Sequence, residues 1–386
     1  MKFAKTDIRR FFKLRWPKGL TCLLVVAAIF CYFGIVMGLP NMLNSLMHTA
    51  HDLLLNTVFF LMAMCVLSGA FGKLLVEFGV VDLIEKLIRP LMKPFYNLPG
   101  VAALGAVLTF LSDNPAILTL AKDKKFACYF KKYQYISLTN FGTSFGMGLI
   151  VMVFMMGQGF YTEPLVGLFG AFCGGIVATR LMQRFVLKAY PQYRDENAVE
   201  AMPQEKEEKE ANSKQSVFIR FLNAILDGGM TGVYTGLAII PGVLIISTFV
   251  MLLTTGPSAE GVYTGAPYEG TGLLPMLAGK VNFLFDWLFG LKDPHLVAFP
   301  ITALGSVGAA LGLVPSFIEQ GWADGNAIAV FTAIGMCWSG YLSTHTAMLD
   351  SLGYRQLTSK DLLAQAVGGL SAAFVAHWLY FLISLI

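Results

Sequence analysis

Long apolar runs are the feature of this sequence that most restricts its fold. Seven stretches of about 20 residues or more are predominantly apolar. They lie at residues 19–39, 51–71, 136–158, 163–183, 229–255, 326–350 and 363–386. A helix of about 20 residues crosses the hydrocarbon core of a bilayer. Only 13% of the 386 residues are charged, against about a quarter in soluble domains, so a soluble enzyme is ruled out. The sequence predicts an all-α polytopic membrane protein.

Two further apolar stretches, residues 99–121 and 294–318, are broken near their centres. The first is interrupted by Ser112-Asp113-Asn114-Pro115 and the second by Gly305-Ser306-Val307-Gly308. Backbone groups freed by such a break must lie inside protein or against a cavity, because lipid offers them no hydrogen bonds. The sequence therefore predicts two re-entrant helical hairpins in addition to about seven transmembrane helices.

Basic residues are distributed very unevenly among the predicted loops. With the hairpins taken as re-entrant, 26 of the 28 Lys and Arg residues fall on one side of the membrane. Only Lys280 and Lys292 fall on the other side. Because cytoplasmic loops are rich in Lys and Arg, this asymmetry predicts a cytoplasmic N-terminus and a C-terminus on the outer side. Residues 1–18 are expected to form a basic amphipathic segment on the cytoplasmic surface.

The charged segment 185–216 divides the chain and is expected to form a cytoplasmic linker. The first half, residues 51–184, contains a span, an amphipathic connector, a hairpin and two more spans. The second half, residues 217–386, repeats this order in the opposite orientation. Residues 19–50 remain as an extra transmembrane helix and an outer loop. Inverted repeats with broken helices are typical of secondary transporters, which bind their solute near the midplane between the repeats.

The tip of the first predicted hairpin carries the most informative side chain. Asp113 is the only carboxylate in either hairpin stretch, and a carboxylate at membrane depth is costly unless it meets a cation, a proton or a polar solute. Alternatively, Asp113 or Asn114 caps the second half-helix, which Pro115 is suited to begin. We interpret Asp113 and Asn114 as candidate substrate-binding residues, together with Ser306 at the break of the second hairpin.

Polar residues also occur in the spans that follow the two hairpins. Asn140, Thr143 and Ser144 lie among glycines, where they would contact a solute or allow close helix packing. The corresponding part of the second half contains Thr344 and His345. His345 is a candidate proton-coupling site or hydrogen-bond donor to a solute, or else a histidine satisfied by a neighbouring hydroxyl. These five complete the predicted substrate-binding set.

The sequence contains no motif for hydrolysis or for nucleotide-driven transport. It has no Walker loop, HExxH motif or paired Cys/His cluster, and its six Cys residues include no CxxC pair. We therefore expect neither an enzyme nor a metal site, and no nucleic-acid partner. The driving energy would come from the solute gradient or from a coupling ion, Na+ or H+.

Three motifs resemble the nucleoside-recognition or Gate domain family of bacterial integral membrane proteins. They are Leu98-Pro99-Gly100, the hairpin tip at residues 113–115, and Thr139-Asn140-Phe141-Gly142-Thr143-Ser144-Phe145-Gly146. Relatives of this family include concentrative nucleoside transporters and spore maturation membrane proteins. The resemblance implies a bacterial cytoplasmic (inner) membrane protein with a midplane cavity between its hairpins. It also implies that Asn140 and Ser144 contact the solute and that Asp113 occupies the polar position of the hairpin.

The predicted function is secondary-active or facilitative transport of a small polar solute, with nucleoside-like solutes as candidates, by alternating access between the inverted repeats. Two alternatives stay open: a non-transporting Gate-domain scaffold or partner protein of the spore maturation type, and a protein that handles lipids or isoprenoids. A homo-oligomer is compatible with all three. A polar, solute-sized cavity between residues 112–115 and 305–308 would favour transport, whereas a dry, packed contact would count against it.

Overall fold

The computed structural model describes residues 16–112, 115–199, 216–258 and 260–385. Within these ranges the chain is helical, with no strand beyond an isolated bridge between Lys131 and Asn197. Six helical stretches are long and apolar enough to cross a membrane: Gly19–Met37, Leu39–Glu77, Lys132–Gly157, Glu163–Ala189, Val217–Thr254 and Arg355–Ser384. The predicted all-α multi-pass fold is confirmed. The predicted N-terminal amphipathic segment lies outside the described residues.

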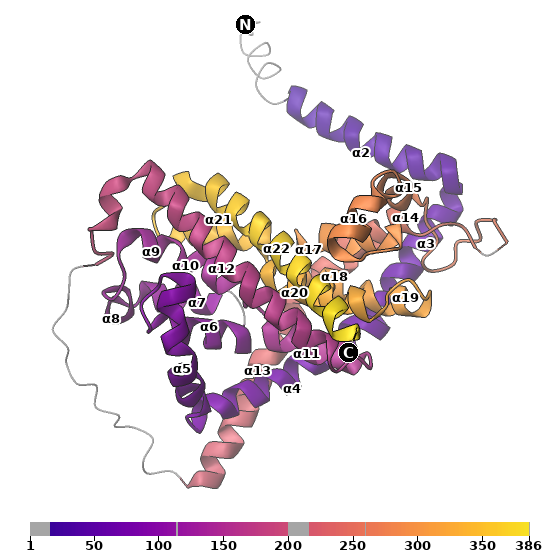
Figure 1. The fold of residues 1–386 in the computed structure, drawn as a ribbon. Coiled ribbons are helices and arrows are strands. Elements are labelled where there is room, and N and C mark those ends of the chain that lie inside the picture. The colour runs from indigo at the N-terminus through magenta and orange to yellow at the C-terminus, as the bar shows by residue number, and fades with distance from the viewer. Residues whose placement is uncertain (1–15, 113–114, 200–215, 259, 386) are drawn as a thin grey trace, which may run out of the picture.

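The first half of the chain contains the helices labelled α2 to α12 (Figure 1). Their bounds are α2 Trp16–Met37, α3 Leu39–Asp52, α4 Phe59–Glu77, α5 Val80–Leu91, α6 Ala102–Leu111, α7 Pro115–Lys122, α8 Lys124–Ala127, α9 Lys132–Ile136, α10 Leu138–Thr143, α11 Gly148–Gly157 and α12 Glu163–Ala189. Short π-helical turns, Leu53–Val58 and Met92–Tyr96, and a 3-10 turn, Pro191–Arg194, adjoin them.

The second half contains the helices α13 to α22. Their bounds are α13 Val217–Pro241, α14 Thr248–Thr254, α15 Leu273–Gly279, α16 Asn282–Phe289, α17 Ala298–Ala303, α18 Val307–Leu311, α19 Val314–Glu319, α20 Gly325–Cys337, α21 Tyr341–Ser351 and α22 Thr358–Ser384. A π-helical turn, Gly242–Ser247, joins α13 to α14, and 3-10 turns occupy Pro294–Val297 and Arg355–Leu357.

Residues 39–52, in the segment predicted as an outer loop, are helical. They form α3, which continues through a π-helical turn into α4. Its polar side chains are satisfied by the loop before α15: Asn41 donates to the Tyr263 carbonyl at 3.0 Å, and Ser45 donates to the Glu269 carbonyl at 2.8 Å. These partners lie more than 200 residues away, so hydropathy along the chain does not reveal that this polar segment is a helix.

Both predicted hairpins are broken at the predicted positions. In the first, α6 ends at Leu111 and α7 begins at Pro115, where the fixed φ of proline and its missing N–H suit the start of a helix. In the second, α17 ends at Ala303 and Ser306 caps α18, its hydroxyl oxygen accepting the Ala309 N–H at 3.3 Å. Each hairpin therefore consists of two short half-helices that meet at a polar tip.

The helices that follow the hairpins are broken as well. Met147 adopts a left-handed conformation, φ 53°, between α10 and α11, and Gly340 does so, φ 63°, between α20 and α21. The predicted span 326–350 is therefore divided into α20 and α21 rather than continuous. Both breaks leave backbone groups without helical partners inside the protein, which is tolerated where they meet protein or a cavity.

Corresponding long helices of the two halves pack against each other in pairs, α4 with α13 and α12 with α22 (Figure 1). Glycines make both contacts close and reciprocal. A Cβ on Gly69 would lie 2.4 Å from the Gly228 carbonyl oxygen, and one on Gly228 would lie 2.4 Å from the Gly69 carbonyl oxygen. Gly174 and Gly368 make the same kind of contact between α12 and α22. This mutual packing is what two inverted halves related by an approximate twofold axis would produce.

The α12–α22 contact leads to a stability prediction. Gly174→Ala is expected to lower the melting temperature of the detergent-purified protein, because the new Cβ would lie 2.4 Å from the Gly368 carbonyl oxygen and 2.6 Å from the Ala372 Cβ. Overpacking of this kind costs about 1–3 kcal/mol. Gly19→Ala in α2, where a Cβ meets nothing within 4 Å, is the matched control and should leave stability unchanged or slightly raised. Equal effects of the two changes would contradict the prediction.

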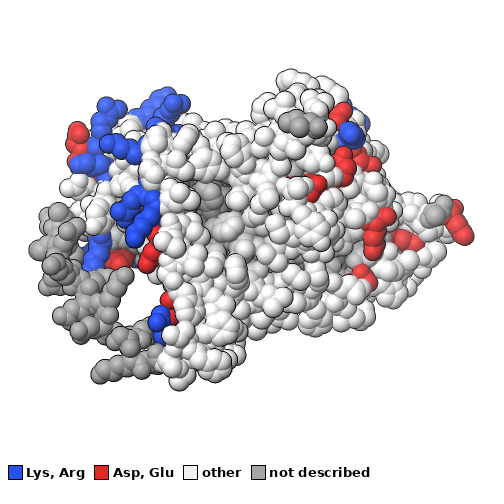
Figure 2. All heavy atoms as spheres, turned by 60° about the horizontal axis from the view of Figure 1, so that its bottom comes forward, with Lys and Arg blue, Asp and Glu red and all other residues white. Residues whose placement is uncertain are grey.

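Charged residues gather at the two ends of the molecule. Figure 2 shows Lys and Arg concentrated at the end formed by α5 to α9, Asp and Glu at the opposite end near α3, α15 and α16, and uncharged surface between them. The first part of the predicted linker folds back on the basic end: Lys132 contacts Glu196 at 2.5 Å, and the Ala198 N–H donates to the Phe130 carbonyl at 2.9 Å. The two charged ends and the uncharged belt are the pattern expected of a membrane-spanning protein.

Candidate functional site: a cavity between the hairpin tips

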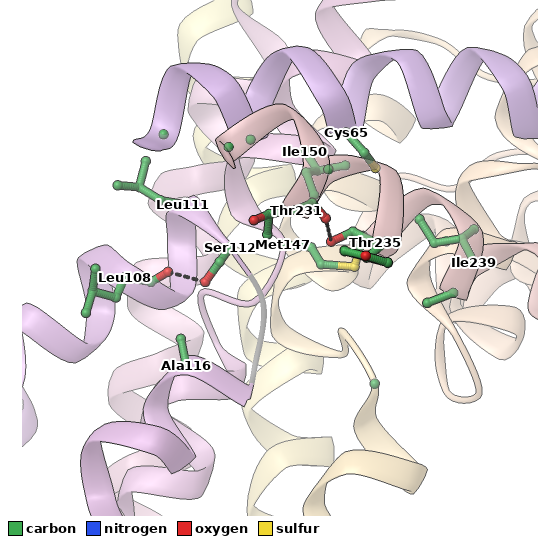
Figure 3. Close-up of a pocket in the computed structure, with 18 of the residues that line it drawn as sticks. Cys65, Leu108, Leu111, Ser112, Ala116, Met147, Ile150, Thr231, Thr235 and Ile239 are labelled. Carbon is green, nitrogen blue, oxygen red and sulfur yellow. Dashed lines mark hydrogen bonds between the residues drawn. The ribbon is translucent and has the colours of Figure 1, made fainter. Parts of the chain in front are cut away.

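A cavity of about 690 Å³ lies where the two hairpin tips meet the paired helices α4 and α13 (Figure 3). The first hairpin contributes Leu108, Leu111, Ser112, Ala116 and Thr119, and the second contributes residues 305–308. Met147 and Gly340 bring one residue from each helix break to the same wall. The cavity is therefore built from equivalent elements of both halves.

The polar groups of the cavity are mainly hydroxyls. Ser112 donates to the Leu108 carbonyl at 2.6 Å, Thr231 to the Asp227 carbonyl at 2.9 Å, and Thr235 to the Thr231 carbonyl at 3.0 Å. Because each hydroxyl proton is used on its own helix, the oxygen lone pairs remain to accept hydrogen bonds from a solute. Lys73 on α4 adds one exposed cation to the wall.

Thr119, Tyr234 and Ser306 add further hydroxyls, and much of the remaining wall is apolar or backbone. Its apolar side chains include Leu108, Leu111, Met147, Ile150 and Ile239, and glycines of both hairpins and helices also line the space. In Figure 3, Ser112, Thr231 and Thr235 lie near Met147 around the same space. A few hydroxyls in an apolar wall suit a small solute that has one polar face and one apolar face.

The predicted substrate-binding residues fall into three groups: one that lines the cavity, those outside the described residues, and those that are buried elsewhere. Ser306 lines the cavity. Asp113 and Asn114 lie outside the described residues, although the flanking Ser112 and Ala116 line the cavity. Thr344 lies in α21, but its side chain is not among those that the structure describes.

The other four predicted residues are buried on the far side of the helix breaks, away from the cavity lining. Thr143 donates to the Thr139 carbonyl of its own helix at 2.9 Å. Asn140 donates to the Asp361 carbonyl and to Gln365 Oε1, both at 3.1 Å. Ser144 accepts a hydrogen bond from Gln365 Nε2 at 3.3 Å. His345 Nδ1 contacts Asp361 Oδ2.

These contacts form one buried polar cluster between α10, α21 and α22, made of Thr139, Asn140, Ser144, His345, Asp361 and Gln365. The structure thus brings Asn140, Ser144 and His345 together through α22, whereas the sequence predicted that they line the solute site. Asp361 and Gln365 were not among the predicted residues. The predicted span began at residue 363, which assigned Asp361 to a loop, whereas α22 begins at Thr358. In the sequence, Asp361 stands four residues before Gln365 at the edge of an apolar run. This spacing on one helix face could have indicated the polar cluster.

Thr231, Thr235 and Lys73 also escaped prediction. The two threonines are four residues apart in an apolar helix, and this spacing places them on one face. Gly228, Gly232 and Gly236 have the same spacing and form the face that packs on α4. Two threonines beside three regularly spaced glycines could therefore have indicated a polar cavity wall next to a close helix contact.

Comparison with known proteins supports the fold and part of the sequence interpretation. Residues 50–159 match the Gate family, described as nucleoside recognition, and this range contains the first hairpin and the segment 139–146. An uncharacterized protein of Alkalihalophilus pseudofirmus is 31% identical over 90 residues, which are 23% of this chain and 19% of that protein. The chain thus matches about a fifth of the length of this curated relative.

Solved structures of CNTnw, a concentrative nucleoside transporter, have a similar fold. Its inward-facing substrate-bound state superposes with a TM-score of 0.54 at 14% identity, covering 96% of this chain and 87% of that chain. A double variant in an outward-facing state superposes with a TM-score of 0.53 at 12% identity, covering 94% and 85%. Residues 50–159 are therefore similar to the Gate family, described as nucleoside recognition, and the fold of the chain is similar to that of a concentrative nucleoside transporter.

Proposed function

We propose that this protein is a membrane transporter that moves a small polar solute, with nucleosides as the leading substrate class. The observation that carries the proposal is the cavity of about 690 Å³ between the two hairpin tips. Its volume lies within the range of about 300–1,000 Å³ found for small-molecule sites. A scaffold protein without a solute has no need of such a space between two broken hairpins, so the cavity favours transport over the scaffold alternative.

The chemistry of the wall supports a nucleoside-like solute. A nucleoside has a hydroxylated sugar and a flat base whose faces are apolar and whose edge carries hydrogen-bonding groups. The hydroxyls of Ser112, Thr231, Thr235 and Ser306 can bond the polar part, while Leu111, Met147 and Ile150 can contact the flat part. The similar fold of a nucleoside transporter, one of whose structures is substrate-bound, supports the same class.

The proposed transport mechanism is alternating access. The α4–α13 pair, fastened by glycine contacts and by the Arg220–Glu77 ion pair at 2.7 Å, would act as a frame. The hairpin α6–α7 meets the cavity from the α5–α9 end of the molecule and the hairpin α17–α18 from the α16–α19 end (Figure 1), and the broken helices α10–α11 and α20–α21 adjoin both. A shift of these elements along the frame would open the cavity at one end and close it at the other. With the basic end in the cytoplasm, the N-terminus lies inside and the C-terminus outside.

Uptake by the purified protein in liposomes tests this proposal. Radiolabelled uridine and adenosine should accumulate faster than in empty liposomes, and an excess of unlabelled nucleoside should suppress the signal. Uptake no faster than in empty liposomes for both probes would reject the nucleoside assignment. Co-purification of a stoichiometric protein partner together with absent uptake would instead favour the scaffold alternative.

The hairpin carboxylate gives a sharper prediction. Asp113→Asn is expected to reduce nucleoside uptake about tenfold or more, because a hydrogen bond to a charged group contributes about 1.5–3 kcal/mol. Asp123→Asn is the matched control, since the exposed Asp123 caps α8 by accepting the Lys125 N–H at 2.9 Å and asparagine caps equally well. Undiminished uptake in Asp113→Asn, measured at equal protein amount, would show that Asp113 acts only as a cap.

A further inference from the structure

A second cavity, of about 380 Å³, is lined by residues of α16, α20 and α22 and shares no lining residue with the cavity between the hairpin tips. Its wall includes the last two turns of α22, where the apolar stretch Arg355–Ser384 ends. The end of a membrane-crossing helix lies at the boundary between lipid and water. The lining combines carboxylates, a lysine, an imidazole and four aromatic side chains, so it differs in chemistry from the hydroxyl-lined cavity.

Hydrogen bonds hold the back wall of this cavity in place. Asn326, in the first turn of α20, donates from Nδ2 to the carbonyls of Phe289 at 2.9 Å and Gly290 at 3.0 Å, at the end of α16. Its Oδ1 lies 2.8 Å from Nδ1 of His377 on α22. Because the amide nitrogen of Asn326 is used on α16, its oxygen accepts the Nδ1–H of His377, and the neutral imidazole has Nε2 as an acceptor. One side chain thus joins all three helices around the cavity.

The charged residues of the lining are two carboxylates and one lysine. Asp324 caps α20 by accepting the Ala327 N–H at 2.9 Å, and its other oxygen lies 3.8 Å from Lys292 Nζ. Asp286 is exposed, and no described residue forms a hydrogen bond or an ion pair with its carboxylate. Both carboxylates and Lys292 lie close enough to His377 to act on it electrostatically. An excess of acceptors over cations suits a ligand that brings a charged group with several N–H donors.

Aromatic side chains supply much of the remaining lining. They are Trp287 of α16 and Trp378, Tyr380 and Phe381 of α22. Trp and Tyr are common where membrane helices meet water, so these rings alone would indicate only an interfacial belt. Here they surround a hollow that also contains carboxylates, and the faces of aromatic rings attract cations. Trp287 is 64% exposed, and Phe283, one turn earlier on the same face of α16, is 74% exposed. Apolar surface therefore adjoins the charged hollow.

We propose that this cavity binds the headgroup of a phospholipid that carries a primary ammonium, of the phosphatidylethanolamine class. The ammonium pairs with Asp286 and Asp324 and lies among the aromatic rings, with His377 Nε2 as a further acceptor. Lys292 turns from Asp324 to the phosphate, and the acyl chains follow the apolar surface of α16. A cavity of about 380 Å³ has the size of a small-molecule site and can hold a headgroup, whereas the chains remain in the bilayer. A ligand with charges of both signs matches a lining with charges of both signs.

Native mass spectrometry of the detergent-purified full chain tests the headgroup preference. Asp286→Asn is expected to raise the Kd of the tightest bound phosphatidylethanolamine about tenfold, because it removes a charge-assisted hydrogen bond. The Kd for phosphatidylglycerol with the same acyl chains should not change, since that lipid has no ammonium. Phosphatidylcholine, whose ammonium has no N–H, should bind wild type and Asp286→Asn with similar Kd. An unchanged Kd for phosphatidylethanolamine in Asp286→Asn would overturn the proposal.

Two controls tie the effect to this cavity. Glu319→Gln removes an exposed carboxylate at the end of α19, outside the cavity lining, and should leave the Kd for phosphatidylethanolamine unchanged. In wild-type protein in nanodiscs, a carbodiimide joins the amine of phosphatidylethanolamine to a nearby carboxylate as an amide. Peptide mass spectrometry should find this lipid adduct on Asp286 or Asp324 and not on Glu319. Adducts in equal yield on all three carboxylates would contradict a defined headgroup site.

A soluble competitor distinguishes a lipid from a free metabolite with the same headgroup. Phosphoethanolamine, which has the ammonium and the phosphate but no acyl chains, should not displace phosphatidylethanolamine at an equal concentration. Displacement by an equal concentration would assign the site to a soluble ligand and overturn the assignment to a lipid. None of these measurements uses a transported solute, so their outcome is independent of the proposed transport function.

Discussion

Replacing Thr235 by Trp is expected to reduce nucleoside uptake by at least about tenfold, which corresponds to about 1.4 kcal/mol or more. Thr235 lies on α13 with its side chain in the cavity, near Ser112 and Met147 (Figure 3). An indole at this position would occupy the space where the two hairpin tips meet the paired helices. The cavity would then lack room for a solute in either orientation of the hairpins. Initial rates of radiolabelled uridine and adenosine uptake in proteoliposomes measure the effect.

Two variants distinguish blockage from misfolding. Leu237→Trp places the same indole two residues away on α13, where the side chain is 48% exposed and outside the cavity lining, and it should transport normally. Thr235→Val keeps the shape of threonine and removes only the hydroxyl, so its loss should be smaller than that of the tryptophan variant. Normal uptake by Thr235→Trp at equal protein amount would show that the solute does not pass through this cavity.

Replacing Asp361 by Leu is expected to lower the free energy of unfolding by about 3–5 kcal/mol, because removing one partner of a buried pair leaves the other uncompensated. His345 would lose its Nδ1 partner in an interior where the side chain has no exposure. Thr139 would lose less, because its hydroxyl also has the Ile136 carbonyl at 2.9 Å as an acceptor. The measurement is the melting temperature of the detergent-purified protein at fixed pH.

A double variant and a surface control complete this test. His345→Leu combined with Asp361→Leu removes both members of the pair, and it should recover much of the stability that the single change loses. Asp350→Ala breaks the exposed pair with Arg355, whose atoms are 3.8 Å apart, and should cost less than about 1 kcal/mol. An Asp361→Leu protein as stable as Asp350→Ala would contradict a close, dry His345–Asp361 contact.

Much of the fold could be predicted because its signals are local or add up along the chain. Apolar runs located the spans, and the breaks at residues 112–115 and 305–308 located both hairpins. The uneven distribution of Lys and Arg along the chain predicted the basic end of the molecule. The break at Gly340 was not predicted, because glycine also occurs within continuous membrane helices and only the left-handed backbone reveals the interruption.

The candidate site could be predicted only in part. Ser306 and the first hairpin tip were found because a polar residue at a helix break is visible in sequence. Asn140 and His345 stood out in the sequence as polar groups at membrane depth that need partners, but their partners, Gln365 and Asp361, lie on α22. Asn140 and Gln365 are 225 residues apart, a separation at which no periodicity relates two side chains.

The sequence by itself determined that this protein spans a membrane, contains two broken hairpins and consists of two halves in opposite orientation. These properties follow from hydropathy, helix-breaking residues and charge, each of which acts along the chain. Only the tertiary structure decided that Thr231 and Thr235 line the cavity while Asn140, Ser144 and His345 face Asp361 and Gln365. The reason is that pairing of α4 with α13 and of α12 with α22 sets which faces meet, and that pairing depends on contacts between glycines more than 150 residues apart.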